Sequence, residues 1–332
     1  MGSVVLEGGY DRLGDGHHTP FFLSSKAGAG RPAGEGKRYS VMRLRDLGRA
    51  RTLAAVTLML SLGAVPGTQE SAEAVGDACG ATVLKADGTA WACTFVDTFD
   101  GLKLNPAKWA VQDTATTGFR VGDTCFKAGQ GVTVGGGTLR LTVQRRTPFS
   151  CQSLLGDLLG KASYTGGAVS SWGRFDKAYG RFETRMKFPA YTGPGLHGGF
   201  WMNPKVRTYG LWPASGEIDV AEFFSGVSQN IYPSLHYTGS TRNDSGFNCP
   251  VSRVDQFHTY AVEWSPTQMD FSYDGQVCFS RTWAPLDLLA PAPFDRSFVL
   301  ALTASTGMGT NAPTSAVPNA NVTQVDYVKV WS

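Results

Sequence analysis

The stretch SGEIDVAEFF, residues 215–224, places three carboxylates within six positions of an otherwise small and apolar run. On a regular strand, residues two apart share a face, so Glu217 and Asp219 point the same way. Glu222, five residues after Glu217, would point the opposite way. One extra residue in the strand, a β-bulge, would return Glu222 to the shared face, and the small Ala221 is a suitable place for it. The spacing therefore predicts a bulged strand that presents all three acids on one surface.

Paired carboxylates on one surface are typical of retaining glycoside hydrolysis, which needs two carboxyl groups about 5–5.5 Å apart, one as nucleophile and one as acid/base. Pleat steps of about 3.3 Å put the Cα atoms of Glu217 and Glu222 roughly 13 Å apart, and inward-leaning side chains would close much of that gap. Crowded carboxylates also push each other's pKa values apart, so that one can stay protonated while another is ionised. Asp219, between the glutamates, can help to hold that difference. The alternatives are a calcium site, which usually draws on Gly-containing loops, or solvated acids, which Phe223 and Phe224 argue against.

Aromatic and polar residues typical of a sugar-binding cleft surround the acids in the sequence. Trp201 and Trp212 flank the acid strand, and His236 follows on the next expected strand. Glu263 and Trp264 come later, in VEWSP. Core packing is the commoner role of any single Trp, but rings offer flat faces to the apolar sides of sugars. We therefore expect substrate-binding residues among these five.

Short runs that alternate apolar and polar residues fill the chain after residue 75, separated by Gly, Pro, Asn and Asp. Alternation predicts strands with one buried face. Many such strands without an internal repeat or linker predict one all-β domain, a β-sandwich or jelly roll. The runs are TLRLTVQR (138–145), YGRFETRMKF (179–188), TYAVEWS (259–265), MDFSYDG (269–275) and TQVDYVKVW (323–331).

A secretion signal is predicted inside the chain rather than at its start. Residues 42–51 are basic, residues 52–65 are apolar, and Ala72-Glu73-Ala74 forms a small-residue cleavage site, which together indicate a signal peptide over 42–74. An uncleaved anchor is the alternative, but the apolar run is short for a membrane span. Two alternatives remain for residues 1–41. Either the start codon has been assigned too early and these residues are not made, or they form a disordered lead. We expect a secreted catalytic domain over 75–332, without stable membrane insertion.

The exported part is nearly neutral, because nine of the 30 Lys and Arg residues and seven of the 27 acids precede residue 75. No basic face for nucleic acid is implied. A polysaccharide is the expected partner, and a monomer is the expected state.

The six cysteines all lie in the predicted exported part, which argues for disulfides. They include no C-x-x-C motif, so a zinc or redox site is disfavoured. Six cysteines allow 15 pairings. We expect sequential pairs, because Cys79 and Cys93 flank an expected hairpin at Asp87-Gly88. The alternative is one or two free buried thiols.

Four stretches now identify a family. WPASGEIDVAEFF (212–224) resembles the signature of glycoside hydrolase family 16 in its bulged E-x-D-x-x-E form, and YGRFETRMKFP, FHTYAVEWSPTQMDFSYDG and VDYVKVW resemble strands of that family. The resemblance covers roughly residues 95–331. It implies a concanavalin A-like β-jelly-roll sandwich with a concave cleft. It also implies retaining endo-hydrolysis of a β-linked polysaccharide, with Glu217 as nucleophile, Glu222 as acid/base and Asp219 assisting.

The bulged form looks most like laminarinases, the endo-β-1,3-glucanases, although galactan-cleaving members share it. Two positions depart from the family pattern. His197 stands where the family often has a cleft Trp, so that a sugar platform is lost, and Thr303 stands about where it has an Asn. Both changes fall where substrate is recognised. Asp326 matches a position that often helps to hold a structural Ca²⁺, and no cofactor is expected for catalysis.

Three functions compete. The first is a secreted endo-β-1,3-glucanase. The second is a galactanase, a cell-wall glycan hydrolase or a transglycosylase of the same family. The third is a carbohydrate-binding, lectin-like protein on the same sandwich, which the presence of both glutamates disfavours because binding alone has no use for them.

Overall fold

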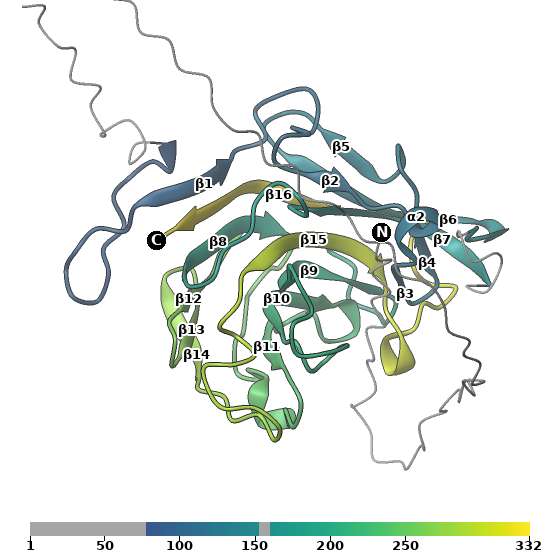
Figure 1. The fold of residues 1–332 in the computed structure, drawn as a ribbon. Coiled ribbons are helices and arrows are strands. Elements are labelled where there is room, and N and C mark those ends of the chain that lie inside the picture. Colours follow the sequence, from purple (N-terminus) through teal and green to yellow (C-terminus); the bar gives the residue numbers. More distant parts are fainter. Residues whose placement is uncertain (1–77, 153–159) are drawn as a thin grey trace, which may run out of the picture. The chain divides into compact units, whose positions relative to one another are not determined.

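A computed structural model describes residues 78–152 and 160–332 (Figure 1). The predicted lead and signal peptide, residues 1–74, lie outside these residues. No helix in the described part is long and apolar enough to cross a membrane.

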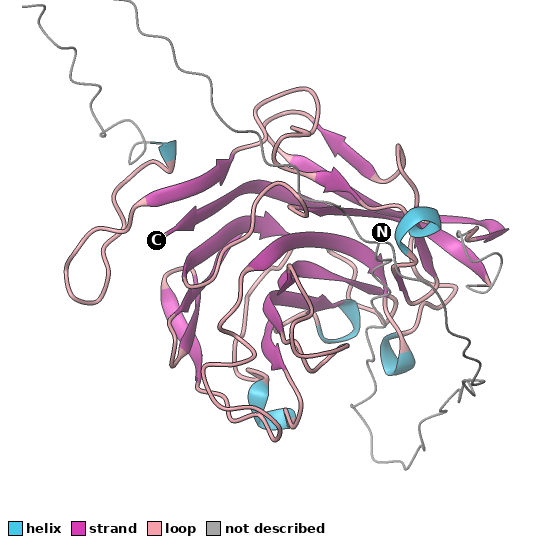
Figure 2. Ribbon diagram, in the orientation of Figure 1, coloured by secondary structure: helices cyan, strands magenta, loops and turns pink. Residues whose placement is uncertain are grey.

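The described part consists almost entirely of strands and loops (Figure 2). Helical structure in this part includes a single α-helical turn, α2 (Thr114–Thr117), and the short 3₁₀ turns η2 (Ser225–Val227), η3 (Arg242–Asp244) and η4 (Gly309–Asn311). The strands are β1 (Cys93–Asp97), β2 (Ala110–Val111), β3 (Arg120–Val121), β4 (Thr124–Phe126), β5 (Val132–Val134), β6 (Leu139–Ser150), β7 (Lys161–Ser170), β8 (Gly180–Lys187), β9 (Leu196–Pro204), β10 (Glu217–Phe224), β11 (Tyr232–His236), β12 (His258–Trp264), β13 (Met269–Tyr273), β14 (Gln276–Arg281), β15 (Phe298–Thr306) and β16 (Ala320–Trp331).

The strands form one continuous path that folds back on itself. Its order is β11-β10-β9-β15-β7-β6-β16-β8-β12-β13-β14. Strand β7 turns the corner, because its first half pairs with β6 and its last residues, 167–170, pair with β15. The result is a layer centred on β9, β10 and β15 that packs on a layer centred on β8, β12 and β16. This arrangement confirms the predicted β-jelly-roll sandwich.

Apolar side chains from both layers meet in one core. Phe223 of β10 stacks on Phe188 with ring centroids 4.7 Å apart. Tyr273 of β13 donates a hydrogen bond to the carbonyl of Val220 across the layers, at 3.0 Å. The face of β10 opposite the acids is thereby fixed in the core, which forces Glu217, Asp219 and Glu222 outward.

The expectation that Trp264 and Glu263 bind substrate is wrong, because both lie on β12, in the layer that does not carry the acids. Trp264 is 2% exposed and packs edge-on against Phe298 at 5.3 Å. Glu263 points to the other face of the strand and pairs with Arg181 at 2.8 Å. Strand alternation explains the difference: one side chain enters the core, and its neighbour forms an ion pair on the opposite face of the strand.

The cysteines pair sequentially, as expected: Cys79–Cys93, Cys125–Cys151 and Cys249–Cys278. No cysteine is free, and all six are among the described residues. The turn at Asp87-Gly88 is also present, since the Asp87 carboxylate accepts from the backbone N–H of Thr89 at 2.9 Å.

Candidate active site

The predicted bulge lies in β10. Asp219 is paired with Ser234 of β11, and the next pair is Glu222 with Tyr232, so three residue steps on β10 match two on β11. On the other side, the register with β9 shifts between Asp219 and Ala221. The extra residue therefore sits at Val220–Ala221, and it returns Glu222 to the face of the other two acids.

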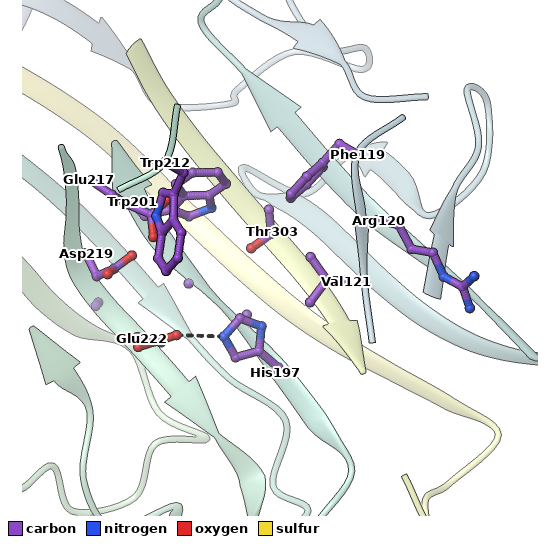
Figure 3. A pocket seen from close by; sticks show the side chains of 13 residues that line it. Phe119, Arg120, Val121, His197, Trp201, Trp212, Glu217, Asp219, Glu222 and Thr303 are labelled. Carbon is purple, nitrogen blue, oxygen red and sulfur yellow. Dashed lines mark hydrogen bonds and ion pairs between the residues drawn. The ribbon is translucent and has the colours of Figure 1, made fainter. Parts of the chain in front are cut away.

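All three carboxylates line one pocket and are nearly enclosed, with Glu217 8%, Asp219 4% and Glu222 5% exposed (Figure 3). Strand β9 runs beside β10 in the sheet, with Gly199 opposite Glu222 at the bulge. A Cβ on Gly199 would lie 2.1 Å from the carbonyl oxygen of Ala221. The bulged backbone can therefore approach β9 only because that position has no side chain.

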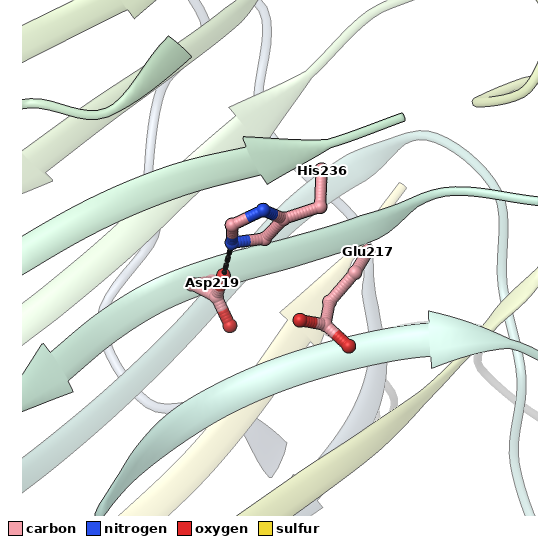
Figure 4. A group of neighbouring side chains, drawn as sticks. All are labelled: Glu217, Asp219 and His236. Atoms are coloured by element: carbon pink, nitrogen blue, oxygen red, sulfur yellow. Dashed lines mark ion pairs between the residues drawn. The ribbon is translucent and has the colours of Figure 1, made fainter. Parts of the chain in front are cut away.

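His236 of β11 is the cation nearest to Asp219. It is paired with Glu217 in the β-ladder, and its Nε2 lies 3.1 Å from Asp219 Oδ2 (Figure 4). Burial alone would lower the pKa of His236, but Asp219 and the two glutamates together raise it to about 9. At neutral pH His236 is therefore an imidazolium that offsets part of the charge of the acids.

Crowding also changes the ionisation of the acids. Burial, and then the charge of Asp219, raise the pKa of Glu217 to about 8. Burial likewise raises the pKa of Asp219, against the opposing effect of the hydrogen bond from His236. The cluster therefore retains a proton at neutral pH, which acid catalysis requires.

Aromatic rings form the walls of the pocket. Trp201 and Trp212 both line it, as expected, and the Trp212 ring lies 5.8 Å from that of His236. Thr303 of β15, where the family pattern has an amide, also lines the pocket. His197 faces the pocket from β9, and its Nε2 lies 2.9 Å from Glu222 Oε1.

Three lining residues were not expected from the sequence: Phe119, Arg120 and Val121. They belong to the segment that includes β3, far from the acids in the sequence. Phe119 reaches the wall beside Trp201, with ring centroids 6.0 Å apart. No motif marks this segment, and the signals that the sequence offered there were its glycines and Cys125.

The position of this segment is set by close contacts with β15. Thr124 and Thr306 share a hydroxyl–hydroxyl contact of 2.9 Å, and the backbone N–H of Asp123 donates to Thr306 Oγ1 at 2.8 Å. Gly122 has φ 53°, and a Cβ there would lie 2.5 Å from the carbonyl oxygen of Gly307. The segment therefore closes one end of the pocket as a packed wall.

The surroundings of Asp326 do not fit the calcium site expected from the family pattern. Its carboxylate pairs with the guanidinium of Arg185, and a fixed cation at that oxygen disfavours a second one. Within residues 78–152 and 160–332, the three acid or imidazole ligand atoms that gather within 4.8 Å belong to Glu217, Asp219 and His236. In this group His236 Nε2 already lies 3.1 Å from Asp219 Oδ2, which fits an ion pair.

Comparison with known proteins gives the same assignment as the geometry. The model of glycosyl hydrolases family 16 matches residues 122–289, about half of the chain. Glucan endo-1,3-beta-glucosidase A1 of Niallia circulans is 29% identical over 261 residues, which cover 71% of this chain but only 37% of that protein. Keratan-sulfate endo-1,4-beta-galactosidase of Sphingobacterium multivorum is 31% identical over 176 residues, covering 51% and 40%.

The fold has close counterparts among solved structures. The laminarinase from Rhodothermus marinus superposes with a TM-score of 0.61 at 25% identity, over 73% of this chain and 97% of that one. The matched family model, these relatives and the bulged acid strand lead to one conclusion: the chain belongs to glycosyl hydrolase family 16.

Proposed function

We propose that the protein is a secreted, retaining endo-β-glycosidase that hydrolyses β-1,3-glucan by double displacement. The observation that carries the proposal is the bulge in β10, which gathers Glu217, Asp219 and Glu222 on one wall of an aromatic pocket. Two of these carboxyl groups supply the nucleophile and the acid/base that such a reaction needs.

In the first step, a carboxylate oxygen of Glu217 bonds to the anomeric carbon while the glycosidic C–O bond breaks. Glu222 gives its proton to the departing oxygen. In the second step, Glu222 removes a proton from water, and the oxygen of that water displaces Glu217 from the anomeric carbon. The second displacement restores the original configuration and both carboxyl groups.

Asp219 and His236 form an ion pair that affects the charge on the two glutamates. The reaction needs Glu217 ionised and Glu222 protonated, so substrate binding has to place the retained proton on Glu222. The His236 imidazolium, 3.1 Å from Asp219, stabilises the negative charge on the nucleophile side of the cluster. Asp219 keeps that cation in place and is an assisting residue, since it lies between the two glutamates.

The polysaccharide is inferred from the relatives. The Niallia protein is named for β-1,3-glucan, and the matched region here includes the acid strand. A galactan is the second candidate, since the Sphingobacterium relative is named for a galactoside and since His197 and Thr303 alter the recognition wall. Transglycosylation would use the same intermediate, with a sugar in place of water.

The proposal also covers where the enzyme acts and in what oligomeric state. Three disulfides suit an oxidising compartment outside the cytosol, in agreement with the signal peptide predicted at 42–74. We propose that the enzyme acts as a monomer without a cofactor. Calcium is left out, because Arg185 occupies the carboxylate of Asp326.

The test is product release from laminarin, mixed-linkage glucan, agarose, carrageenan and arabinogalactan by the purified protein and by Glu217→Gln. We expect oligosaccharides from laminarin with the parent and none with the variant, which should still fold and bind sugar. Cleavage of a galactan alone would replace the glucan assignment. Undiminished turnover by Glu217→Gln would overturn the nucleophile, and a folded parent silent on every polymer would favour a binding protein.

A further inference from the structure

His197 lines the pocket, and its ring is held against the candidate acid/base, Glu222. Its Nε2 lies 2.9 Å from Glu222 Oε1 (Figure 3). Its Nδ1 lies 3.3 Å from Ser305 Oγ. The side chain is only 12% exposed, and the ring of Phe224 lies 5.0 Å away. The imidazole therefore offers little of its face to a sugar, although the family resemblance places it where a cleft tryptophan often stands.

The strands fix this arrangement on both sides. In the β-ladders, His197 of β9 is opposite Ser305 of β15 and opposite Phe224 of β10. Ser305 is fully buried. Both ring nitrogens are thus engaged by residues of neighbouring central strands, so the ring is held by the sheet itself.

We propose that His197 is a positioning residue that determines which oxygen of Glu222 carries the catalytic proton. The inference rests on the proposed function and adds a residue to it. In its neutral form, imidazole donates at one nitrogen and accepts at the other. Ser305 Oγ lies 3.3 Å from Nδ1 and 3.4 Å from the carbonyl oxygen of His197, so its one proton can be donated to either. In the proposed arrangement the hydroxyl donates to Nδ1, and Nε2–H donates to Glu222 Oε1. The acidic proton of Glu222 then resides on Oε2, the oxygen left for the substrate.

The contact between His197 and Glu222 does not change which protons are transferred in the reaction. In the first step the proton leaves Oε2 for the glycosidic oxygen as that C–O bond breaks and Glu217 bonds to the anomeric carbon. The resulting carboxylate of Glu222 still accepts from His197, and a hydrogen bond to a charged acceptor is stronger than one to a neutral acid. In the second step Oε2 takes a proton from water. His197 neither gains nor loses a proton in either step.

Two substitutions of His197 separate positioning from sugar stacking. His197→Gln keeps an N–H group at nearly the reach of Nε2, whereas His197→Phe keeps a flat ring and loses the donor. We expect His197→Gln to retain most of kcat and His197→Phe to lose about tenfold or more, with KM little changed. The reverse order, an active His197→Phe and a raised KM for His197→Gln, would show a sugar platform and overturn the proposal.

The dependence of the rate on the leaving group tests whether His197→Phe impairs proton donation by Glu222. Two aryl β-laminaribiosides are compared, one with phenol and one with 2,4-dinitrophenol as leaving group. Dinitrophenolate departs without protonation, so His197→Phe should be impaired far more on the phenyl substrate. Equal impairment on both substrates would indicate a merely structural role and would contradict the inference.

A spectroscopic measurement on the full chain needs no substrate. In ¹⁵N–¹H spectra of the imidazoles we expect the Nε2–H tautomer of His197, with its signals moved by Glu222→Gln. An Nδ1–H tautomer, or signals indifferent to Glu222→Gln, would overturn the assignment. This readout stands even if the parent cleaves no β-glucan, so failure of the proposed function and failure of the positioning role are told apart.

Discussion

At the scale of single residues, the site is a balance of charge in a small enclosed volume. Three carboxylates less than a tenth exposed would repel one another strongly without His236 beside Asp219 and a proton retained by the cluster. The same crowding that makes the cluster costly would let two chemically identical side chains, Glu217 and Glu222, take the opposite roles proposed for them.

The role of Glu222 can be tested by replacing it with a small exogenous anion. Glu222→Ala should lower kcat about 10²–10⁴-fold, because general acid–base catalysis contributes that much. With a dinitrophenyl glycoside, added azide should restore turnover by attacking the intermediate and give a β-glycosyl azide. Glu217→Ala is the control, and azide there should give the inverted product. Retention of full rate by Glu222→Ala would contradict the acid/base role.

At the scale of elements, the bulge in β10 depends on its neighbour β9. Gly199 leaves space for the displaced carbonyl of Ala221, 2.1 Å from where a Cβ would lie. The acid motif and this glycine are therefore one structural unit, although some twenty residues separate them.

Gly199→Ala should destabilise the fold by about 1–3 kcal/mol and lower kcat about tenfold, because the bulge must shift and carry Glu222 with it. Gly135→Ala is the matched control, since nothing lies within 4 Å of a Cβ there. Urea unfolding and initial rates provide the two readouts. A Gly199→Ala protein with parental stability and rate would show that the bulge does not need this space.

The wall that carries Phe119 depends on a disulfide. Cys125 in β4 is joined to Cys151, the residue after β6. Replacing both with Ser should cost about 2–4 kcal/mol of stability and also raise KM for long substrates, because the wall loosens. The matched control replaces Cys79 and Cys93, which pack in a separate small cluster with Trp331. That variant should lose stability only, and an equal rise in KM for both would contradict a local effect.

At the scale of the whole molecule, the active site reduces stability above acidic pH. The pKa of Glu217 is raised from 4.5 to about 8 on folding. Between these values the folded protein binds more protons than the unfolded chain, so the free energy of unfolding falls as pH rises. The pKa of His236 is raised from 6.5 to about 9. Its stabilisation is complete below pH 6.5 and is lost as pH rises through 9.

Glu217→Gln removes the first of these titrations. We expect the variant to match the parent near pH 4.5 and to be more stable by on the order of 1–3 kcal/mol at pH 8. Urea unfolding of both proteins at pH 4.5, 6 and 8 measures the difference, and circular dichroism checks that the fold is retained. A variant less stable than the parent at pH 8 would show that Glu217 is stabilised, not strained, by its surroundings.

The sequence by itself determined the fold class, the bulge and the face that carries the acids. Those properties depend on local alternation and on an odd spacing between Asp219 and Glu222, both of which are written in consecutive residues. Of the sequential disulfides, local spacing indicated only Cys79–Cys93, and the other two pairs were expected by extension.

Only the tertiary structure decided which distant residues join the acids. In the folded protein, Trp264 and Glu263 lie in the opposite layer, and the Phe119 segment lines the pocket. Asp326 pairs with Arg185, and His197 lies against Glu222. Alternation tells which residues share a face of one strand, but it does not tell which strands become neighbours. That choice is made when the two layers close over a common core, because the free energy of burial belongs to the whole sandwich and not to any one strand.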